Sequence, residues 1–390
     1  MAPPFSREEY ADRLDRVRHA MQAKGFDALV IGDPANVNWL TGYDAWSFYT
    51  PQIMVVGLEL DPTWIGREMD AGAAAFTTYL PEEQVVPFPE DMVQQVGVHP
   101  AQFMGDWMKS KGLDGKSIGY ESDVYFLTPA AVAHLQARLP NSTWTDCQVL
   151  VNWQRLVKSP AEIRMMQQAA VIAAKTMQTA YDGARRGVRQ CDLMADVAAA
   201  QIRGTPDFGG DMPALHPLIL AGEAAATAHP MWTDAPLEHD QTIAFELGAC
   251  RKRYNVGLAR TVHIGDPPDV LQRTAKAVGE GMDQILASMR SGVECCDVHA
   301  AWQAVLDQYG LEKKSRIGYS IGVGYAPDWG EHTISFRPGD HNVLPENAVV
   351  HIILGMWMDG WGMEISETIH VRENDAVCLT QFPRNVHVVD

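Results

Sequence analysis

Residues 242–264 read TIAFELGACRKRYNVGLARTVHI, two alternating runs joined by a basic turn, and this pattern is typical of a β-hairpin. In the first run, alternation places Glu246 on one face with the small neighbours Ala244 and Gly248. The opposite face carries large apolar residues such as Phe245, which can pack against helices. Small neighbours leave space in front of the carboxylate, so Glu246 is a candidate site residue.

The hairpin also allows a structural role for Glu246. Its turn contains Arg251 and Arg253, and either side chain could pair with the carboxylate at the strand end. The second strand carries no acid. These residues alone leave both roles open.

The chain around the hairpin predicts two domains. Residues 1–155 alternate helix and strand, which indicates a small α/β domain with a mixed sheet. Residues 156–390 interleave helices with antiparallel strands, which indicates an α+β domain. It opens with a helix over 157–187, in which Ser159 is the N-cap and Pro160 the first residue. Further helices are expected at 8–24, 190–203, 268–290 and 297–309, strands at 26–33, 52–60, 216–221, 242–249, 255–264, 315–324, 347–357 and 361–371, and a turn-rich passage at 33–44.

Net charge and composition limit the classes of partner that the protein can bind. The chain of 390 residues has 31 basic and 49 acidic residues, a net charge of -18. This balance argues against nucleic-acid and anionic-membrane partners and favours a small-molecule partner. No apolar run approaches the roughly 18 residues of a membrane span. We expect a cytoplasmic protein whose six cysteines are reduced thiols, because they show neither metal spacing nor a disulfide framework.

Motifs along almost the whole chain resemble the creatinase/prolidase family. They are VKSPAEIRMM at 157–166, AHPMWTDAPLEHDQ at 228–241, the hairpin, GYSIGVGYAPDWGEH at 318–332, VVHIILGMW at 349–357 and GMEISETIHV at 362–371. The resemblance implies a creatinase-like α/β N-terminal domain followed by an α+β C-terminal catalytic domain of the pita-bread fold, the creatinase/aminopeptidase fold.

The same resemblance bears on metal binding. Metal-dependent members hold two metal ions with five ligands, and those positions are occupied here by Glu246, Gly257, Tyr319, Ile353 and Ser366. One carboxylate cannot hold a pair of divalent ions, so we expect no metal and no other cofactor. Creatinase itself also uses two carboxylates, whose positions here are Ala259 and Ile353, so creatine is not the expected substrate.

The segments DPANVNWLTGYDAWSFY at 33–49 and GYSIGVGYAPDWGEHT at 318–333 resemble metal-free members that hydrolyse a cyclic amidine. Their substrate is a zwitterion, an amidinium ring that carries a carboxylate, and the product is an N-acetylated diaminobutyrate. The resemblance implies that Glu246 is the nucleophile or base and that His229 transfers a proton. A histidine bonded only to a turn carbonyl is the alternative for His229.

Other residues are candidates for substrate binding. Tyr319 replaces a ligand histidine, and Glu364 shares a strand face with Ser366. Aromatic faces can stabilise a cation by roughly 0.5–2 kcal/mol each. The family dimer implies that an N-terminal segment covers the neighbour's cleft, so a homodimer is expected, and a deacetylase that consumes the product is a further expected partner. The substrate-binding candidates are Trp46, Tyr49, Tyr319, Asp328, Glu331, Trp357 and Glu364, with Asp328 and Glu331 in a loop.

Three alternatives remain. A hydrolase of the same fold could act on another amidine, or the domain could be an inactive module that binds a peptide. A metal-dependent peptidase or lyase is the third, and the missing ligands argue against it.

Overall fold

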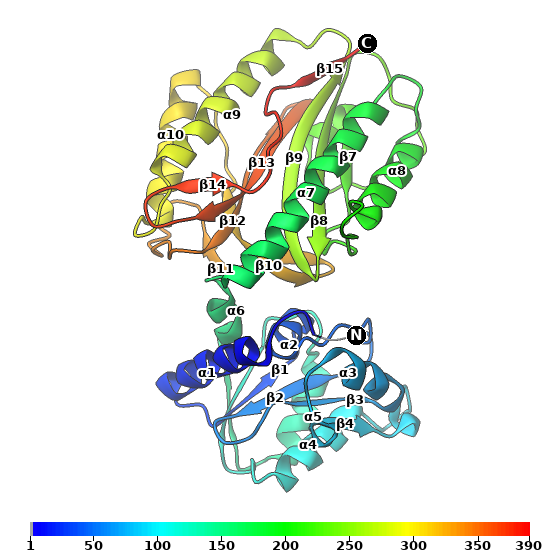
Figure 1. Cartoon of the computed structure of the whole chain (residues 1–390), viewed down its shortest axis with the longest axis vertical. Coiled ribbons are helices and arrows are strands. Elements are labelled where there is room, and N and C mark those ends of the chain that lie inside the picture. The colour runs from blue at the N-terminus through cyan, green and yellow to red at the C-terminus, as the bar shows by residue number, and fades with distance from the viewer. Residues whose placement is uncertain (1–2) are drawn as a thin grey trace. The chain divides into compact units, whose positions relative to one another are not determined.

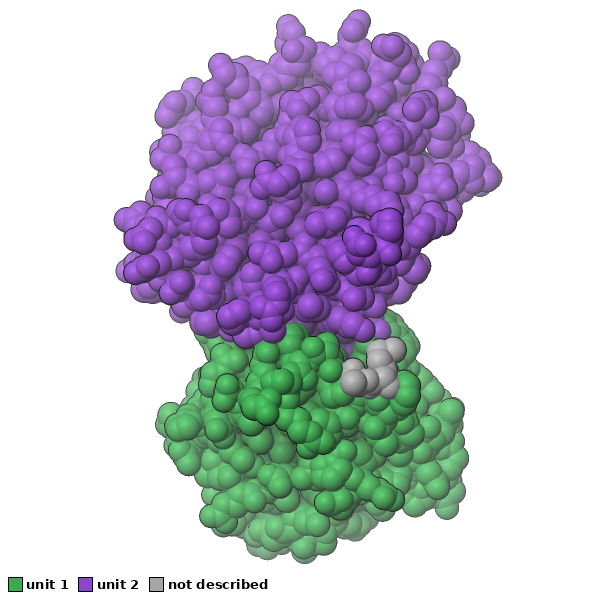
Figure 2. Space-filling view, viewed as in Figure 1, with its two compact units in different colours: residues 1–155 green, residues 156–390 purple. Residues whose placement is uncertain are grey.

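The computed structural model describes residues 3–390. Contacts between Cα atoms divide the chain into two compact units, the first ending at Arg155 and the second spanning Leu156–Asp390 (Figure 2). Among the described residues, no helix is both long enough and apolar enough to cross a bilayer.

Unit 1 contains a six-stranded sheet in the order β4-β3-β2-β1-β5-β6. It is mixed, because β1 pairs antiparallel with β2 and parallel with β5. Apolar side chains of the sheet pack with those of α4 and α5 in one core cluster. The strands are β1 (Ala28–Ile31), β2 (Ile53–Gly57), β3 (Thr63–Arg67), β4 (Val85–Phe88), β5 (Ser117–Tyr120) and β6 (Thr143–Asp146). The helices are α1 (Arg7–Lys24), α2 (Pro34–Thr41), α3 (Ala71–Thr77), α4 (Pro100–Ser110), α5 (Pro129–Arg138) and α6 (Leu150–Arg155), with 3-10 turns η1 (Glu68–Asp70), η2 (Glu82–Gln84) and η3 (Glu90–Met92).

Unit 2 contains a nine-stranded sheet, in which β14-β13-β12-β10-β9-β8-β7 follow one another. β11 pairs with β10, and β15 pairs with β9. The strands are β7 (Leu218–Ala221), β8 (Gln241–Arg251), β9 (Tyr254–Ile264), β10 (Gly318–Tyr325), β11 (Asp328–Ser335), β12 (Val349–Met358), β13 (Trp361–Val371), β14 (Ala376–Cys378) and β15 (His387–Val389). The helices are α7 (Pro160–Gly183), α8 (Gln190–Arg203), α9 (Asp269–Ser288) and α10 (Cys295–Tyr309), with the 3-10 turn η4 (Gly222–Ala226).

Helices pack against both halves of this sheet. α7 packs on β8 and β9, while α9 contacts β13 and β14 (Figure 1). The start of α7 is fixed by a capping box, since the Ser159 hydroxyl accepts the Glu162 N–H and the Glu162 carboxylate accepts the Ser159 N–H. The hairpin β8–β9 pairs over its whole length, from Gln241 opposite Ile264 to Arg251 opposite Tyr254.

The predicted fold class is confirmed: unit 1 is α/β with a mixed sheet, and unit 2 has the mixed α+β architecture of the pita-bread fold. Two local predictions were wrong. Most of the turn-rich passage at 33–44 forms helix α2, which is capped by the Asp33 carboxylate, the acceptor of the Ala35 N–H. The expected loop after residue 324 forms β11, which doubles back on β10.

Candidate active site

A pocket of about 440 Å³ opens in unit 2 in front of Glu246. This residue lies in the middle of β8, where it pairs with Ala259 of β9 and Leu218 of β7. Its neighbours on the same face are small, as the alternation predicted, so its side chain reaches the cavity while remaining 6% exposed. The lining residues are Leu215, His229, Glu246, Lys313, Ser315, Arg316, Gly318, Tyr319, Pro327, Asp328, Trp329, Ile353, Trp357 and Glu364.

Two buried carboxyl groups, Glu246 and Glu364, form the acidic part of this pocket. Among residues 3–390, neither side chain has a hydrogen-bond or ion-pair partner, and Oε1 of Glu364 is fully shielded from solvent without one. Burial raises the pKa of Glu246 to about 7. Burial, and then repulsion from Glu246, raises the pKa of Glu364 well above its usual range. Burial therefore opposes ionisation of the pair, and a cation beside it would favour ionisation.

The arginines of the hairpin turn do not pair with Glu246. The Arg251 guanidinium donates to Oε1 of Gln168 at 3.1 Å and to the Gly209 carbonyl at 3.2 Å. The Arg253 guanidinium lies over the Tyr325 ring, 5.0 Å from its centroid. The structural role considered for Glu246 is thus excluded.

Cationic groups face the carboxyl pair from the segment between α10 and β10. The ammonium of Lys313 donates to the Gly355 carbonyl at 2.8 Å and to the Ser315 hydroxyl at 2.9 Å, and it lies 4.3 Å from the Trp357 ring centroid. Burial lowers the pKa of Lys313 to about 8, although Glu364 opposes this shift. The Arg316 guanidinium stacks over the Tyr319 ring at 4.5 Å and makes no hydrogen bond or ion pair among the described residues. The pocket thus presents both signs of charge.

His229 also lines this pocket, but its side chain is solvent-exposed. Its backbone has φ of 71°, in the left-handed region that non-glycine residues seldom adopt. Such strain is concentrated at functional sites. The imidazole has no hydrogen-bond partner among residues 3–390, so the alternative of a histidine bonded to a turn carbonyl is excluded.

Aromatic and acidic groups complete the wall. The Trp329 indole N–H donates to the Tyr319 hydroxyl at 2.9 Å. Asp328 accepts the Gly330 N–H at 2.7 Å and contacts the His332 imidazole at 2.8 Å. Burial opposes ionisation of Asp328, but these two hydrogen bonds, together with the charges of His332 and Arg316, outweigh it and lower the pKa of Asp328. Asp328 is therefore an ionised group of the wall, unlike the carboxyl pair.

The five positions that hold metal in other family members are filled differently here. A Cβ added to Gly257 would lie 2.4 Å from Cε1 of His351, so an imidazole occupies the space next to that position. Nε2 of His351 hydrogen-bonds the Ser366 hydroxyl at 2.8 Å, and that hydroxyl accepts the Ala259 N–H at 2.7 Å. Burial lowers the pKa of His351 to about 3, so it is neutral. These residues do not fit a binuclear metal centre.

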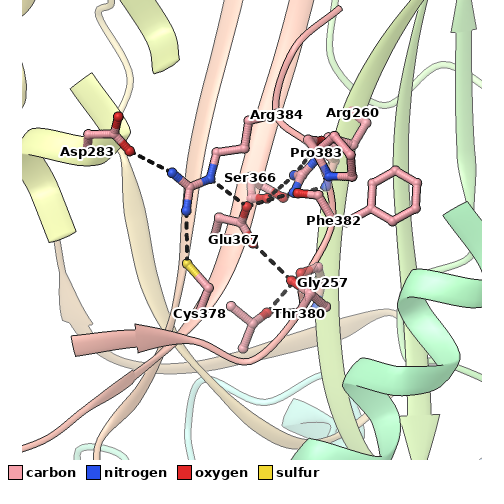
Figure 3. Close-up of polar contacts among 12 residues, drawn as sticks. Gly257, Arg260, Asp283, Ser366, Glu367, Cys378, Thr380, Phe382, Pro383 and Arg384 are labelled. Atoms are coloured by element: carbon pink, nitrogen blue, oxygen red, sulfur yellow. Dashed lines mark hydrogen bonds and ion pairs between the residues drawn. The ribbon is translucent and has the colours of Figure 1, made fainter. Parts of the chain in front are cut away.

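Arg260 and Thr261, adjacent residues of β9, bind this strand to β13. Arg260 is fully buried, and its guanidinium donates to Oε1 of Glu367 and to four carbonyl groups (Figure 3). The Thr261 hydroxyl donates to the Glu364 carbonyl and accepts the Glu364 N–H, both at 2.9 Å. Glu364 is thereby held in register with the hairpin that carries Glu246.

Six predicted site residues line the pocket, and three do not. Glu331 was predicted to bind substrate, but it is fully buried away from the pocket lining and forms an ion pair with Lys158 at 2.7 Å, so its role is structural. Trp46 and Tyr49 belong to unit 1, where they are 56% and 67% exposed, and neither lines this pocket. The six that do are Glu246, His229, Tyr319, Asp328, Trp357 and Glu364.

Sequence reasoning missed Lys313, Arg316 and His351. The run KKSR at 313–316 stands directly before the strand that carries Tyr319, and this proximity could have suggested a cationic wall. His351 had no comparable signal, because its proximity to Gly257 depends on how β9 and β12 approach each other.

Two family models match the chain: the Creatinase/Prolidase N-terminal domain over residues 13–157 and Metallopeptidase family M24 over residues 164–373. The chain is 40% identical to the uncharacterized hydrolase/peptidase y4tM of Sinorhizobium fredii, covering 99% of both chains. It is 37% identical to ectoine hydrolase of Halomonas elongata, covering 99% of this chain and 98% of the relative. A crystal structure of prolidase from Thermococcus sibiricus superposes with a TM-score of 0.85 at 17% identity, covering 97% of this chain and 99% of the other.

Proposed function

The chain belongs to the creatinase/prolidase family of hydrolases, and we propose that it opens the cyclic amidine ring of ectoine or hydroxyectoine to give an N-acetylated 2,4-diaminobutyrate. The observation that carries the proposal is the pair of carboxyl groups without protein partners, opposite cations in one pocket. The relative named ectoine hydrolase supports the choice of substrate.

The charges of the pocket are complementary to such a zwitterion. An amidinium is a planar cation, and beside Glu246 and Glu364 it would compensate the cost of ionising buried carboxyl groups. The substrate carboxylate would meet Arg316, which offers a planar pair of N–H donors at the pocket wall. Lys313 adds positive charge, although its ammonium is already bonded to Gly355 and Ser315.

In the proposed reaction, a carboxylate oxygen of Glu246 attacks the carbon between the two ring nitrogens. That carbon is already electrophilic in an amidinium, so no metal is needed to polarise it. The C–N bond to one ring nitrogen then breaks, and this nitrogen takes a proton and leaves as an amine. Water attacks the ester-like adduct, releases the amide product and restores the carboxylate. Alternatively, Glu246 acts as the base that activates the attacking water.

Two groups can supply the proton to the leaving nitrogen. His229 is an exposed imidazole at the pocket, and imidazoles transfer protons readily near neutral pH. Burial raises the pKa of Glu364 well above its usual range, which favours its protonated form. His229 is the proposed donor. If so, His229→Ala should slow nitrogen departure and let the adduct accumulate, whereas Glu364→Gln should mainly weaken substrate binding.

The proposal includes catalysis without a metal ion. Its support is the donor set at the five ligand positions, where a single carboxylate remains and the His351 imidazole fills space next to Gly257. Extensive chelation should therefore leave kcat unchanged. Activity that disappears with the metal and returns when zinc, iron or manganese is added would contradict this part of the proposal.

The direct test incubates chelator-treated protein with ectoine, hydroxyectoine, creatine and Xaa-Pro dipeptides, and detects ring-opened or cleaved product by mass spectrometry. Conversion of ectoine or hydroxyectoine is expected. Conversion of creatine alone would indicate another amidine, and no conversion at all would favour an inactive binding module. Rapid quenching of the His229→Ala reaction should locate a covalent adduct on the peptide 242–250 if Glu246 is the nucleophile; its absence would assign Glu246 as the base.

Two partners belong to the same proposal. A homodimer would allow Trp46 and Tyr49 of one subunit to cover the site of the other, which light scattering with mixed-mutant activity assays would test. A deacetylase acting on N-acetyl-diaminobutyrate would consume the product. We place the activity in the cytoplasm.

A further inference from the structure

A second group of potential metal ligands lies in unit 2 outside the pocket. Glu294 precedes the first residue of α10, Cys296 is the second residue of that helix, and His341 belongs to the segment between β11 and β12. None of the three lines the pocket around Glu246. His341 is solvent-exposed, and Cys296 is partly exposed, so the group is open to ions from solution.

The distances within this group match the edges of a tetrahedral zinc site. Sγ of Cys296 lies 3.6 Å from Nδ1 of His341 and 3.4 Å from Oε2 of Glu294. Zinc bonds of about 2.3 Å to sulfur and about 2.0–2.1 Å to nitrogen or oxygen give sulfur edges of about 3.5 Å. The third separation, 2.7 Å between His341 and Glu294, is a hydrogen bond that a bound ion would replace. That edge would lengthen to about 3.3 Å.

Backbone hydrogen bonds hold the two segments together independently of these side chains. The Cys296 N–H donates to the Asp340 carbonyl at 2.9 Å, and the Cys295 N–H donates to the Asn342 carbonyl at 3.0 Å. Two residues further, the Leu344 N–H donates to the Val293 carbonyl at 2.9 Å. The three ligand atoms are therefore brought together by the fold, and small side-chain movements suffice to surround an ion.

We propose that Glu294, Cys296 and His341 bind one zinc ion, with water as the fourth ligand. A thiolate and an imidazole favour zinc over calcium or magnesium, which prefer oxygen ligands only. On binding, the Cys296 thiol releases its proton to solvent and the His341 imidazole coordinates in its neutral form. The adjacent carboxylates Asp297 and Asp340 add negative charge that favours a cation.

The ion would act as a cross-link between the start of α10 and the segment that leads to β12. A ligand that binds only the folded state stabilises it in proportion to its concentration relative to Kd. Zinc should therefore raise the Tm of the protein without changing its hydrolytic rate. This site is independent of the proposed function, because its residues do not touch the pocket.

The test uses untagged full-length protein that has been stripped with chelator, incubated with zinc and passed through gel filtration. Elemental analysis should find one zinc per chain in the wild type and in Cys191→Ser, a control at a partly exposed thiol elsewhere. Cys296→Ser should lose the zinc. Cobalt, used in place of zinc, should give a sulfur-to-cobalt charge-transfer band in the wild type and the control but not in Cys296→Ser.

Two outcomes would overturn this proposal: a wild type that retains no zinc after gel filtration, or a Cys296→Ser variant that retains as much as the wild type. The Cys296→Ser variant also separates the two proposals. Stripped of metal, it should still hydrolyse substrate at the wild-type rate. If only the variant is inactive, the two sites are not independent. If the stripped wild type is inactive as well, the metal-free mechanism fails while the zinc measurements stand unaffected.

Discussion

Strand β13 carries two buried glutamates three residues apart, and their surroundings differ completely. Glu367 is 1% exposed and accepts hydrogen bonds from Arg260, Arg384 and Thr380 (Figure 3). Glu364 is 2% exposed, and its carboxyl group has no hydrogen bond among the described residues. The same strand thus holds one carboxylate that is fully paired and one that is not.

The difference distinguishes a glutamate that stabilises the fold, Glu367, from one that is a candidate for function, Glu364. A buried charge is costly unless it is paired, so Glu367 and Arg260 satisfy each other and fix β9 against β13. Glu364 and Glu246 have no hydrogen-bond or ion-pair partner among residues 3–390, and burial raises the pKa of both because it opposes their ionisation. A cationic substrate would supply the missing partner. An unpaired buried acid in a pocket is therefore the better indicator of function.

The largest expected effect is on catalysis. Glu246→Gln keeps the volume and hydrogen bonding of the side chain. It removes the negative charge that either attacks the amidinium carbon or activates the attacking water. We expect turnover to fall by more than about 10³-fold with the fold intact. Steady-state kinetics measure the fall in turnover, and circular dichroism checks that the fold is intact. If more than about a tenth of the rate remains, Glu246 is not the central group, and Asp328 and Glu364 become the candidates.

The next effect concerns the paired carboxylate. Arg260→Met removes one partner of a buried ion pair and leaves Glu367 without its main compensation, which should lower the free energy of unfolding by about 3–5 kcal/mol. Urea denaturation measures this loss. Glu367→Gln should also destabilise the fold, in contrast to Glu246→Gln. Equal stability of Arg260→Met and the wild type would show that the network is not structural.

A smaller effect follows from the raised pKa of Glu246. The folded state binds the Glu246 proton more tightly than the unfolded chain, so wild-type stability should fall as pH rises from about 4.5 to about 7. Glu246→Gln removes this loss and should be more stable than the wild type at pH 8 by up to about 3 kcal/mol. Denaturation curves at pH 5 and pH 8 provide the comparison. A variant less stable than the wild type at both pH values would refute a destabilising, functional carboxylate.

The smallest expected effect is at the cationic wall. Arg316→Gln should raise KM by roughly tenfold to a hundredfold, the value of a hydrogen bond to a charged group, with little change in kcat. Arg337→Gln, at an exposed arginine that does not line the pocket, controls for the change in net charge. If both variants bind substrate equally well, the substrate carboxylate is held elsewhere.

Much of the site followed from strand alternation and from the family resemblance. The period of two placed Glu246 on the face with small neighbours, and the structure has it facing the pocket. The same reasoning placed Glu364 inward. Alternation was not applied to Glu331, because its region was expected to be a loop, and its ion-pair partner Lys158 lies 173 residues earlier in the chain. It gave no indication of His351, whose contact with Gly257 joins strands far apart in sequence.

By itself, the sequence determined the local elements, since apolar periodicity, capping residues and turn residues act over a few positions. It also determined which chemical groups were available: one carboxylate at the five ligand positions, and a histidine at 229. Only the tertiary structure decided which charges are compensated. Glu364 and Glu367 are chemically identical residues on one strand. Contacts from β9 and the C-terminal segment pair Glu367, whereas Glu364 faces the cavity. Burial and pairing are long-range properties, and they set the pKa on which the proposed chemistry depends.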